Sequence, residues 1–516
     1  MKKAAFLLFL LSLGGTLAAQ SNFSDTVGSS YLVENIALPP GLEAETGGLA
    51  FFPDGRLVAC FTRGEVMIYD PKSKQWQLFA EGLHEPLGIL VESNSTVVVL
   101  QRPELTRIKD TDSDGKADVY ENINDDFGIS GNYHEFNYGP VKDKDGNFFL
   151  ALNTASSGGG IRSNPRGKLN LLGRDGADGR RQMYSVVPYR GWVVKVTPDG
   201  ELLPFASGFR SPNGLGFDLK GNLFVADNQS DWVETSALHH VQENNFYGHP
   251  ASLVWKEGWD KGSPFDLPIE VLDSMRTKAA VLFPHGIIAN SPSEPVIVKT
   301  TEFGPFEGQF LVGEMNRERI VRVMLEYVDG QFQGACIPFI DNQGLKKGNN
   351  RMTFAPDGSL WVGQIAHGWL GDQGIQKITY TGTLPMDIYR MNLTPEGFEI
   401  TFTQPVDAME AMKKDNYQFT HYRYDYKKKP YDEPVDQSNQ SDIHTVPVAD
   451  IRISDDHKTV AIKLHELKPG YVYELKLNRI TSQNGTPLEN SLICYTLNKL
   501  ASGETGKQVH NNLNIP

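Results

Sequence analysis

The sequence predicts an all-β protein, with a six-bladed β-propeller over residues 31–382 and an Ig-like β-sandwich over residues 383–499. Two observations lead to this prediction. A strand–turn–strand pattern recurs along the first part of the chain, as expected for the blades of a propeller. Strands of alternating apolar and polar residues then follow over about a hundred residues, as expected for a small sandwich.

The repeat is clearest within residues 208–231. Residues 215–217 and 223–226 are short apolar runs, and the turn between them contains Gly221 and Asn222, which accept positive φ angles. Further copies lie at 48–58 and 352–362, with weaker ones at 87–100, 138–152 and 286–314. Because polar blade edges converge on the central channel of a propeller, we expect a ligand to bind there.

Two segments interrupt the repeats. Residues 156–190 are rich in Gly, Arg, Ser and Asn, and residues 252–278 form a second irregular excursion, so we expect long loops there. Within the sandwich, residues 398–402, 460–464 and 471–477 alternate strictly. The sandwich carries no recognisable chemistry, so we expect it to dock or space the propeller.

Both ends of the chain have a distinctive composition. Residues 1–19 have the basic start, short apolar run and small residues of a cleaved signal peptide, which predicts a periplasmic or secreted protein. The alternative, a membrane anchor, would need a longer apolar run, and no later segment is apolar enough to cross a membrane. Residues 500–516 are polar and expected to be disordered. The net charge of −14 argues against nucleic acid as a partner.

The chain contains three cysteines, Cys60, Cys336 and Cys494, which are far apart in the sequence. We interpret them as small buried hydrophobic residues rather than as a disulfide framework or a metal site. The chain has no Cys-x-x-Cys-His motif, so it carries no c-type haem.

An oxygen-rich loop predicts a Ca²⁺ site. Residues 110–121 match the calcium-loop pattern D-x-D-x-D-G-x5-E in full, and Ca²⁺ prefers six to eight such hard oxygen ligands. The flanks read as strand and loop, so the site is expected to be structural; the alternative is an acidic solvated turn. The predicted ligand set is Asp110, Asp112, Asp114, Lys116, Asp118 and Glu121.

Histidines and arginines recur at matching blade edges. His134, just before the third repeat, could act as a general base near neutral pH, or it could be a loop histidine bonded to a backbone carbonyl. His285 and His367 are further candidates at the channel edge. Arginine forks bind carboxylates well, and the alternative is ordinary surface pairing. The arginines at these edges are Arg210, Arg317, Arg319 and Arg351.

At this point the chain resembles a known family. His134, then Gly208-Phe-Arg-Ser-Pro-Asn-Gly-Leu-Gly-Phe217, Asp227-Asn-Gln229 and Asn245-Phe-Tyr-Gly-His-Pro250 follow one another in the order seen in the glucose/sorbosone dehydrogenases. That family consists of soluble quinoproteins with a six-bladed propeller, a G-x-R-N-P-Q-G-L-x-F blade and a closing N-Y-G-W-P. The resemblance covers residues 31–382, and it is closest to secreted bacterial members in which an Ig-like domain follows.

The resemblance implies pyrroloquinoline quinone (PQQ) and Ca²⁺ as cofactors and a cytochrome c as a possible electron acceptor. It also implies that His134 is the catalytic base and that Arg210 contacts the cofactor and favours the charge that develops on it. The chain departs from the family wording at Ser211, Asn213 and His249. The residues that would contact the cofactor or its calcium are Arg210, Asn213, Asn228, Gln229, Arg317 and Arg351.

Two functions are therefore compatible with the sequence. The first is a PQQ- and calcium-dependent dehydrogenase that oxidises a hydroxyl group of a sugar or polyol. The second is a non-catalytic, calcium-stabilised propeller that binds a carbohydrate or a protein partner. Because one fold hosts many functions, the fold alone does not distinguish them.

Overall fold

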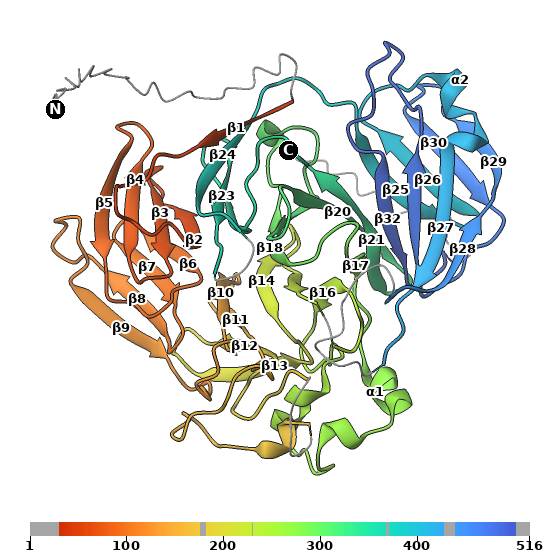
Figure 1. Cartoon of the computed structure of the whole chain (residues 1–516). Helices are drawn as coiled ribbons and strands as arrows, with labels where there is room; N and C mark the ends of the chain where they lie inside the picture. The colour runs from red at the N-terminus through yellow and green to blue at the C-terminus, as the bar shows by residue number, and fades with distance from the viewer. Residues whose placement is uncertain (1–29, 176–181, 230, 368–370, 428–438, 502–516) are drawn as a thin grey trace, which may run out of the picture.

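The computed structural model describes residues 30–175, 182–229, 231–367, 371–427 and 439–501. The predicted signal peptide (1–19) and residues 502–516 of the predicted disordered tail lie outside these ranges. The described part is built almost entirely from antiparallel sheets, and the all-β fold predicted from the sequence is confirmed. Six four-stranded meanders stand side by side in a ring, and a second β domain stands beside it (Figure 1).

The first three blades follow the chain in order, from the innermost strand outward. Blade 1 contains β2 (Thr46–Phe51), β3 (Leu57–Phe61), β4 (Val66–Asp70) and β5 (Gln75–Ala80). Blade 2 contains β6 (Ile89–Ser93), β7 (Thr96–Leu100), β8 (Leu105–Lys109) and β9 (Val119–Asn124). Blade 3 contains β10 (Asn137–Lys142), β11 (Phe148–Leu152), β12 (Trp192–Val196) and β13 (Leu202–Ser207).

The other three blades complete the ring. Blade 4 contains β14 (Pro212–Phe217), β15 (Leu223–Asp227), β16 (Ser236–Val241) and β17 (Val281–Phe283). Blade 5 contains β18 (Pro292–Ile297), β19 (Phe310–Glu314), β20 (Ile320–Val328) and β21 (Gln331–Phe339). Blade 6 contains β22 (Asn349–Phe354), β23 (Leu360–Gln364), β24 (Gly374–Tyr380) and β1 (Tyr31–Asn35).

The ring is closed by its first strand. β1 pairs antiparallel with β24, with Tyr31 opposite Tyr380, so the outer strand of the last blade comes from the start of the chain. The inner strands approach one another closely: a Cβ added to Gly88, just before β6, would lie 1.5 Å from the carbonyl oxygen of Gly139. Closure therefore ties the start of the chain to the last blade of the propeller.

The two irregular excursions carry short helices. Residues 156–190 include η1 (Leu171–Gly173), and the second excursion contains η2 (Pro250–Trp255), η3 (Pro264–Asp266) and α1 (Ile269–Met275). These helices lie together below blades 3 and 4 in Figure 1. Elsewhere the helices are η4 (Thr301–Phe303), α2 (Ala408–Ala411) and η5 (Lys414–Asn416). Within the described ranges, no helix has both the length and the apolar character needed to cross a bilayer.

The C-terminal domain is a sandwich of two sheets that pack face to face. One sheet has the order β25 (Ile388–Thr394), β26 (Gly397–Phe402), β30 (Thr459–Leu464) and β29 (Val448–Ile453). The other has the order β32 (Leu492–Leu497), β31 (Tyr471–Leu477), β27 (Tyr417–Arg423) and β28 (Ser441–Val446). Alternating side chains of both sheets, such as Phe398 and Phe419, whose rings stack 5.9 Å apart, form the shared core.

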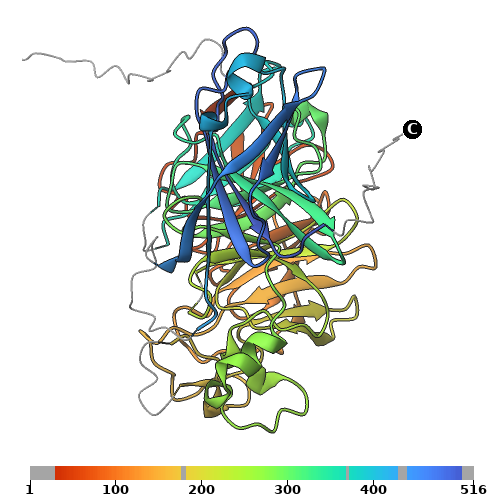
Figure 2. The same cartoon turned by 90° about the vertical axis from the view of Figure 1, so that its right-hand side faces the viewer.

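The sandwich is not a separate body attached by a linker. β32 pairs with β21, with Cys494 opposite Cys336, so blade 5 and one sandwich sheet form a continuous eight-stranded sheet. Figures 1 and 2 show the sandwich standing directly against this side of the ring. The sequence placed the domain boundary at Gly382, and the chain does pass there from β24 to β25, but hydrogen bonding and packing continue across it.

A buried ion pair fastens the same junction. Arg322 on β20 donates to the Asp387 carboxylate at 2.9 Å and to the carbonyl oxygen of Ile388 at 2.7 Å, and its guanidinium lies 3.7 Å from the centre of the Phe306 ring. Both charged side chains are almost completely buried. Removing one partner of such a pair leaves an uncompensated charge in the interior, so this pair fixes where the chain enters the sandwich.

The three cysteines are buried free thiols, as the sequence predicted. Cys336 and Cys494, far apart in the sequence, lie opposite each other at the propeller–sandwich junction. Burial raises the pKa of both thiols, so they behave as apolar side chains at neutral pH.

We predict that a chain ending at Gly382 fails to give a stable monomeric propeller. It would expose the β21 edge together with Met324, Ala335 and Ile337, which pack into the sandwich core. Size-exclusion chromatography with light scattering should show aggregation, whereas a chain ending at Leu500 should elute like the full-length protein. A monomeric truncated propeller with the melting temperature of the full chain would contradict this expectation.

Candidate functional site

The meander topology places most of the predicted mouth residues on one face of the ring. Strands alternate in direction within a blade, so the loops that precede each inner strand and those that join its second and third strands open on the same face. We call this face the upper mouth. His134 and Arg210 precede β10 and β14, and Asn228 follows β15, so all three lie there.

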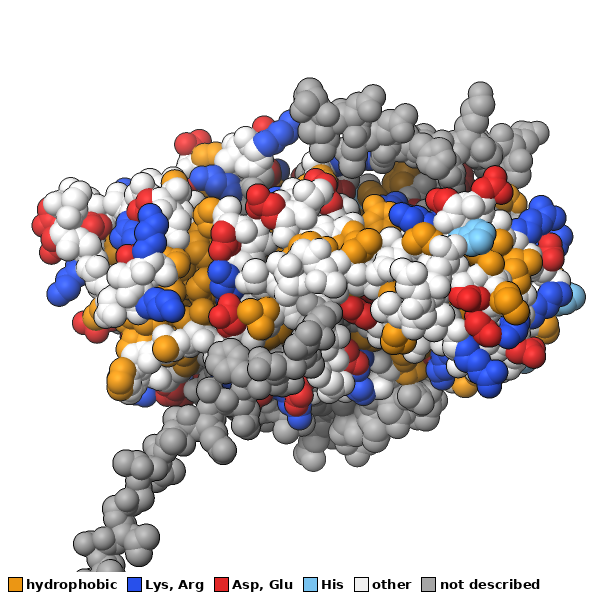
Figure 3. Space-filling view, turned by 90° about the horizontal axis from the view of Figure 1, so that it is seen from above, with side chains coloured by type: hydrophobic (Ala, Val, Ile, Leu, Met, Phe, Trp, Pro, Cys, Tyr) orange, Lys and Arg blue, Asp and Glu red, His pale blue; other side chains and the backbone are white. Residues whose placement is uncertain are grey.

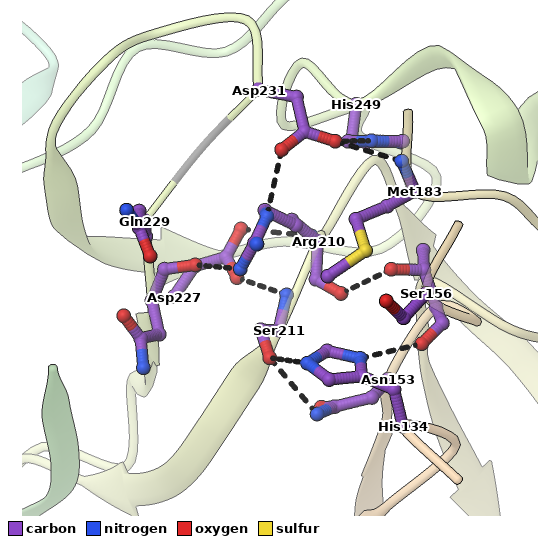
Figure 4. A network of polar contacts seen from close by, with 12 residues as sticks. His134, Asn153, Ser156, Met183, Arg210, Ser211, Asp227, Gln229, Asp231 and His249 are labelled. Atoms are coloured by element: carbon purple, nitrogen blue, oxygen red, sulfur yellow. Dashed lines mark hydrogen bonds and ion pairs between the residues drawn. The ribbon is translucent and has the colours of Figure 1, made fainter. Parts of the chain in front are cut away.

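His134 is held as a neutral base with a defined orientation. Its Nδ1 lies 2.9 Å from the carbonyl oxygen of Thr154, a bond that requires a proton on Nδ1 and leaves the lone pair on Nε2. Nε2 lies 3.5 Å from Oγ of Ser211, which accepts from Nδ2 of Asn153 at 3.0 Å (Figure 4). Burial and the Arg210 charge lower the pKa of His134 to about 3. The alternative of a loop histidine bonded to a backbone carbonyl is confirmed. The role of His134 as a general base stays a prediction, and its lowered pKa departs from the near-neutral value that the sequence suggested.

Arg210 is paired with a carboxylate that the sequence analysis did not single out. Nε of Arg210 donates to Asp231 at 2.9 Å, and Nη1 donates to the carbonyl oxygen of Asn228 at 3.2 Å. Asp231 also accepts from His249 Nε2 at 3.2 Å and from the Met183 amide at 3.0 Å. Burial alone would raise the pKa of Asp231, but Arg210 and His249 outweigh it and hold the pKa at about 2. The positive charge of Arg210 is therefore neutralised within the site.

A second carboxylate shapes the same loop. Asp227, at the end of β15, accepts the backbone amides of Arg210 at 3.0 Å and Ser211 at 2.7 Å. Burial raises its pKa to about 6, because the hydrogen bonds only partly compensate for lost hydration. Asp227 thus fixes the turn that carries Arg210 and Ser211 toward His134.

Three buried polar atoms around this network have no hydrogen-bond partner among the described residues. They are Oδ1 of Asn153, Oδ1 of Asn228 and Nδ1 of His249. Each belongs to a residue whose other atoms are bonded within the network, to Ser211, Arg210 and Asp231 respectively. Because buried polar groups are nearly always satisfied, such a cluster indicates a polar ligand or bound water. Sequence patterns gave no signal for it.

The other residues predicted to contact a cofactor have structural partners. Arg351 on β22 donates to the carbonyl oxygens of Leu87 at 3.1 Å and Asn213 at 2.9 Å, and it lies 4.8 Å from the Tyr138 ring. These bonds join inner strands across the channel. Arg317 donates to the carbonyl oxygen of Gly286 at 2.7 Å. Both guanidinium groups are therefore engaged by backbone oxygens.

Two further predicted residues lie close to the network. The backbone amide of Gln229 donates to Ser236 at 2.9 Å, and its φ angle of 44° turns the chain at the end of β15. Nδ2 of Asn213 lies 3.2 Å from the Met315 sulfur. Asn213 is thus part of the channel lining, and Gln229 belongs to the loop that carries Asn228 and Asp231.

A second charged cluster lies on the other side of Phe136. His367 Nε2 lies 3.1 Å from Glu85, whose other oxygen pairs with Arg102, and the His367 amide donates to Glu45 at 3.0 Å. The Phe136 ring centre is 4.5 Å from that of His367 and 5.6 Å from that of His134. Burial raises the pKa of Glu85, but bonds from His367 and Arg102 outweigh it and hold the pKa at about 2. The sequence pointed to His367 but not to its partners.

The predicted calcium loop lies away from the upper mouth. It joins β8 to β9, the third and fourth strands of blade 2, so it opens on the opposite face and at the outer edge. It contacts blade 1, where Gln77 donates to the Gly115 carbonyl at 3.0 Å and the Ala117 amide donates to Phe79 at 2.8 Å. A cation here would fasten two blades and would not take part in chemistry at His134.

Only part of the predicted ligand set converges. Carboxylate oxygens of Asp110, Asp112 and Asp118 lie within 4.8 Å of one another, a spacing that fits a shared cation. Asp114 accepts the Lys116 amide at 2.8 Å. Glu121 lies on β9 and is turned to Lys109 at 2.6 Å and Arg107 at 3.3 Å, so it is paired with cations rather than with the aspartates.

Charges elsewhere on the surface are mixed. On the part of the described surface that Figure 3 shows, acidic and basic side chains are interspersed, and neither sign forms a broad field.

Comparison with known proteins places this chain in a family without a described activity. A family model described as a domain of unknown function (DUF7133) matches residues 67–370, which lie within the propeller. No curated protein is significantly similar to the chain.

Several similar solved structures are sugar or glucose dehydrogenases of low sequence identity. The PQQ-bound aldose sugar dehydrogenase of Streptomyces coelicolor is 17% identical, with a TM-score of 0.44, over 68% of this chain and 98% of that one. The soluble aldose sugar dehydrogenase of Escherichia coli is 13% identical, with a TM-score of 0.46, over 68% and 99%. A Thermus thermophilus protein proposed to be a glucose dehydrogenase is 18% identical, with a TM-score of 0.47, over 67% and 99%.

We predict that chelation lowers the melting temperature of the protein. A cation bound only to the folded state stabilises it by about 2.7 kcal/mol at a hundredfold excess over its Kd. Differential scanning calorimetry with EGTA and with added Ca²⁺ should show this shift, and Asp112→Asn should abolish most of it. Asp145→Asn, in an exposed turn of blade 3, is the matched control and should keep it. Identical melting curves with and without chelator would count against the site.

We also predict a pH signature of His134. Its folded pKa of about 3 lies below the ordinary value of 6.5, so between these values the unfolded chain binds a proton that the folded chain does not. His134 therefore costs stability as the pH falls through that window, by up to about 1.4 kcal/mol per pH unit. In urea unfolding between pH 7 and pH 4, the free energy of unfolding of His134→Asn should rise relative to that of the wild type as the pH falls. The difference between the exposed control His465→Asn and the wild type should stay constant over the same range. Parallel profiles for both variants would refute the assignment.

Proposed function

We propose that this chain, which belongs to the DUF7133 family, binds a sugar or another polyol at the upper mouth and oxidises one of its hydroxyl groups. The observation that carries the proposal is a neutral, oriented His134 beside three buried polar atoms, Oδ1 of Asn153, Oδ1 of Asn228 and Nδ1 of His249, that have no hydrogen-bond partner among the described residues. The resemblance of the blade 4 sequence to glucose/sorbosone dehydrogenases supports the same reaction class.

The unpartnered atoms suit a ligand rich in hydroxyl groups. Oδ1 of Asn153 and Oδ1 of Asn228 can each accept a hydrogen bond from a hydroxyl group, and Nδ1 of a neutral His249 whose Nε2 donates to Asp231 can accept another. Since Asp231 neutralises Arg210, the network has no strong preference for an anion. A neutral polyol would satisfy all three atoms without bringing an unpaired charge into the interior.

In this proposal, His134 accepts the proton of the substrate hydroxyl group. Nε2 carries the lone pair, faces Ser211 and can take the proton of a substrate hydroxyl placed beside it. A base with a pKa of about 3 is weak, so it takes this proton as hydride leaves the carbinol carbon rather than beforehand. Thr154 holds the imidazole in place throughout, because its carbonyl oxygen binds Nδ1 in both protonation states.

Oxidation needs an acceptor for hydride, and a quinone of the PQQ type would supply one when bound. Among the described residues, the Arg210 guanidinium fits a carboxylate at one polar edge of such a group, and Oδ1 of Asn228 could accept a hydrogen bond from an N–H or O–H donor beside it. Arg317 and Arg351 are engaged by backbone oxygens, so they add no further anchor. The pairing of Arg210 with Asp231 opposes a cofactor with several carboxylates, which makes Asp231 the residue that limits its affinity.

The proposal also includes a structural Ca²⁺ ion and a location outside the cytoplasm. The Asp110–Asp112–Asp118 cluster would hold one structural Ca²⁺ between blades 2 and 1. A signal peptide at residues 1–19 would direct the protein to the periplasm or the exterior, where a cytochrome c could accept the electrons. Mass spectrometry of the mature N-terminus tests the location directly.

We predict that His134→Ala lowers turnover by about 10²–10⁴-fold, the usual contribution of a positioned base, while leaving sugar affinity within a few-fold. The assay is dye reduction by protein reconstituted with PQQ and Ca²⁺, over a panel of sugars and polyols. His465→Ala, an exposed histidine in the sandwich, should retain full activity. The dehydrogenase proposal is wrong if the wild type reduces no dye with any panel member.

We predict that Asp231→Asn raises the affinity for PQQ by about tenfold or more, because it releases the positive charge of Arg210 toward a cofactor carboxylate. Isothermal titration calorimetry measures the change. Asp341→Asn, which releases Arg319 in blade 5, is the matched control and should leave the affinity unchanged. Equal affinities for all three proteins would show that Arg210 does not contact the cofactor.

A second function is favoured by the neutralised arginine. A site in which the Arg210 guanidinium is paired with Asp231 suits a neutral carbohydrate better than a charged cofactor. Binding of a panel sugar in calorimetry without PQQ binding or dye reduction would identify the protein as a carbohydrate-binding propeller.

A further inference from the structure

A strap from the sandwich reaches the loop that carries Asp231. We use the name strap for residues 424–427, which continue from β27 and leave the sandwich sheet. Tyr426 forms an antiparallel bridge with Val233, and the Lys427 amide donates to the carbonyl oxygen of Trp232 at 2.9 Å. The strap thus adds a short strand to the loop between β15 and β16 of blade 4.

Tyr426 also holds a second segment of the mouth. Its hydroxyl donates to the carbonyl oxygen of Gly248 at 2.6 Å, and its ring centre lies 5.6 Å from that of Trp232. The guanidinium of Arg276 covers the other side, 4.8 Å from the ring centre. The Tyr426 side chain is 8% exposed, so these contacts form in the interior.

The two segments held by Tyr426 carry the two partners of one hydrogen-bonded pair, Asp231 and His249. Trp232 directly follows Asp231, and Gly248 directly precedes His249. Asp231 and His249 lie 3.2 Å apart, and Asp231 in turn binds Arg210 at 2.9 Å. One side chain of the sandwich therefore contacts the chain next to Asp231, which neutralises Arg210, and next to its partner His249.

We infer that the sandwich is a structural part of the mouth and that Tyr426 is a positioning residue for the Asp231–His249 pair. Tyr426 acts through its hydrogen bond to Gly248 and its pairing with Val233, not by touching a ligand. The inference deepens the proposed function, because a displacement of Asp231 by about 1 Å would change both the charge on Arg210 and the ligand geometry. Its structural part does not depend on which ligand binds.

The test uses a reporter on the far side of Asp231. The Met183 amide, on the excursion between β11 and β12, donates to the Asp231 carboxylate at 3.0 Å. If Tyr426 positions Asp231, then Tyr426→Phe should speed hydrogen exchange at the Met183 amide by about tenfold or more, since it removes the bond to Gly248. The amide of Val66 in blade 1 serves as the internal reference and should exchange at the wild-type rate.

A matched variant separates positioning from general stability. Tyr417 is another buried sandwich tyrosine whose hydroxyl donates to a backbone carbonyl, that of Ala411 at 2.8 Å. Tyr417→Phe should lower the melting temperature as much as Tyr426→Phe does, yet leave Met183 exchange unchanged. Equal Met183 exchange in the wild type, Tyr417→Phe and Tyr426→Phe would overturn the inference.

The outcome is independent of the proposed activity. Exchange at Met183 is measured on the full-length protein without substrate, so faster exchange supports the inference even if no sugar is oxidised. If sugars are oxidised, Tyr426→Phe should also lower turnover while Tyr417→Phe does not. Unchanged turnover and unchanged exchange in Tyr426→Phe would leave the oxidoreductase proposal standing and reject only the role of Tyr426.

Discussion

The buried carboxylate of Asp231 is the interaction on which the upper mouth depends. A lone ionised carboxyl group in this interior would be strongly unfavourable, and Arg210, His249 and the Met183 amide compensate for its lost hydration. These three partners come from three separate segments of the chain. Asp231 therefore joins blade 4, the excursion between β11 and β12 and the segment before η2 into one rigid assembly, beside which His134 is oriented.

The Arg210–Asp231 pair also determines the net charge of the upper mouth. A bare Arg210 beside His134 would attract anions and would depress the basicity of the imidazole further. Paired with Asp231, it remains a hydrogen-bond donor but contributes little net charge. The result is a mouth with a neutral imidazole, a compensated cation and three buried polar atoms, on Asn153, Asn228 and His249, that have no partner among the described residues, and this arrangement is the basis of the proposal that a neutral polyol binds there.

The sandwich supports the propeller directly, because one of its strands pairs with the outer strand of blade 5. A propeller blade normally ends in an exposed outer strand, whereas β21 of blade 5 is covered by β32 and the sheet continues. The buried Arg322–Asp387 pair and the strap around Tyr426 fasten the two domains at separate points. The geometry of the mouth is thereby linked to a domain with no recognisable chemistry of its own.

Sequence reasoning found the features that local chemistry encodes. The turn around Gly221, the alternation in residues 398–402 and the spaced aspartates of residues 110–118 are short-range patterns, and each led to an element or loop that the structure contains. His134 and Arg210 were identified because they precede inner strands of the repeat. Glu121 was included by spacing alone, but β9 directs its side chain to Lys109 and Arg107. The assignment of the sandwich to the Ig type and the roles of the site residues remain predictions.

By itself, the sequence determined that this chain is all-β, that repeated strand–turn–strand units precede alternating strands, and that titratable groups stand at the ends of those units. These properties depend on residues a few positions apart, where φ preferences and side-chain alternation act. Only the tertiary structure decided that Asp231 neutralises Arg210, that Arg351 binds backbone oxygens across the channel, and that Tyr426 of the sandwich binds the carbonyl oxygen of Gly248. Those contacts join residues up to 264 positions apart, as for Arg351 and Leu87, and no local pattern specifies which distant partner compensates a buried charge or binds a given carbonyl oxygen.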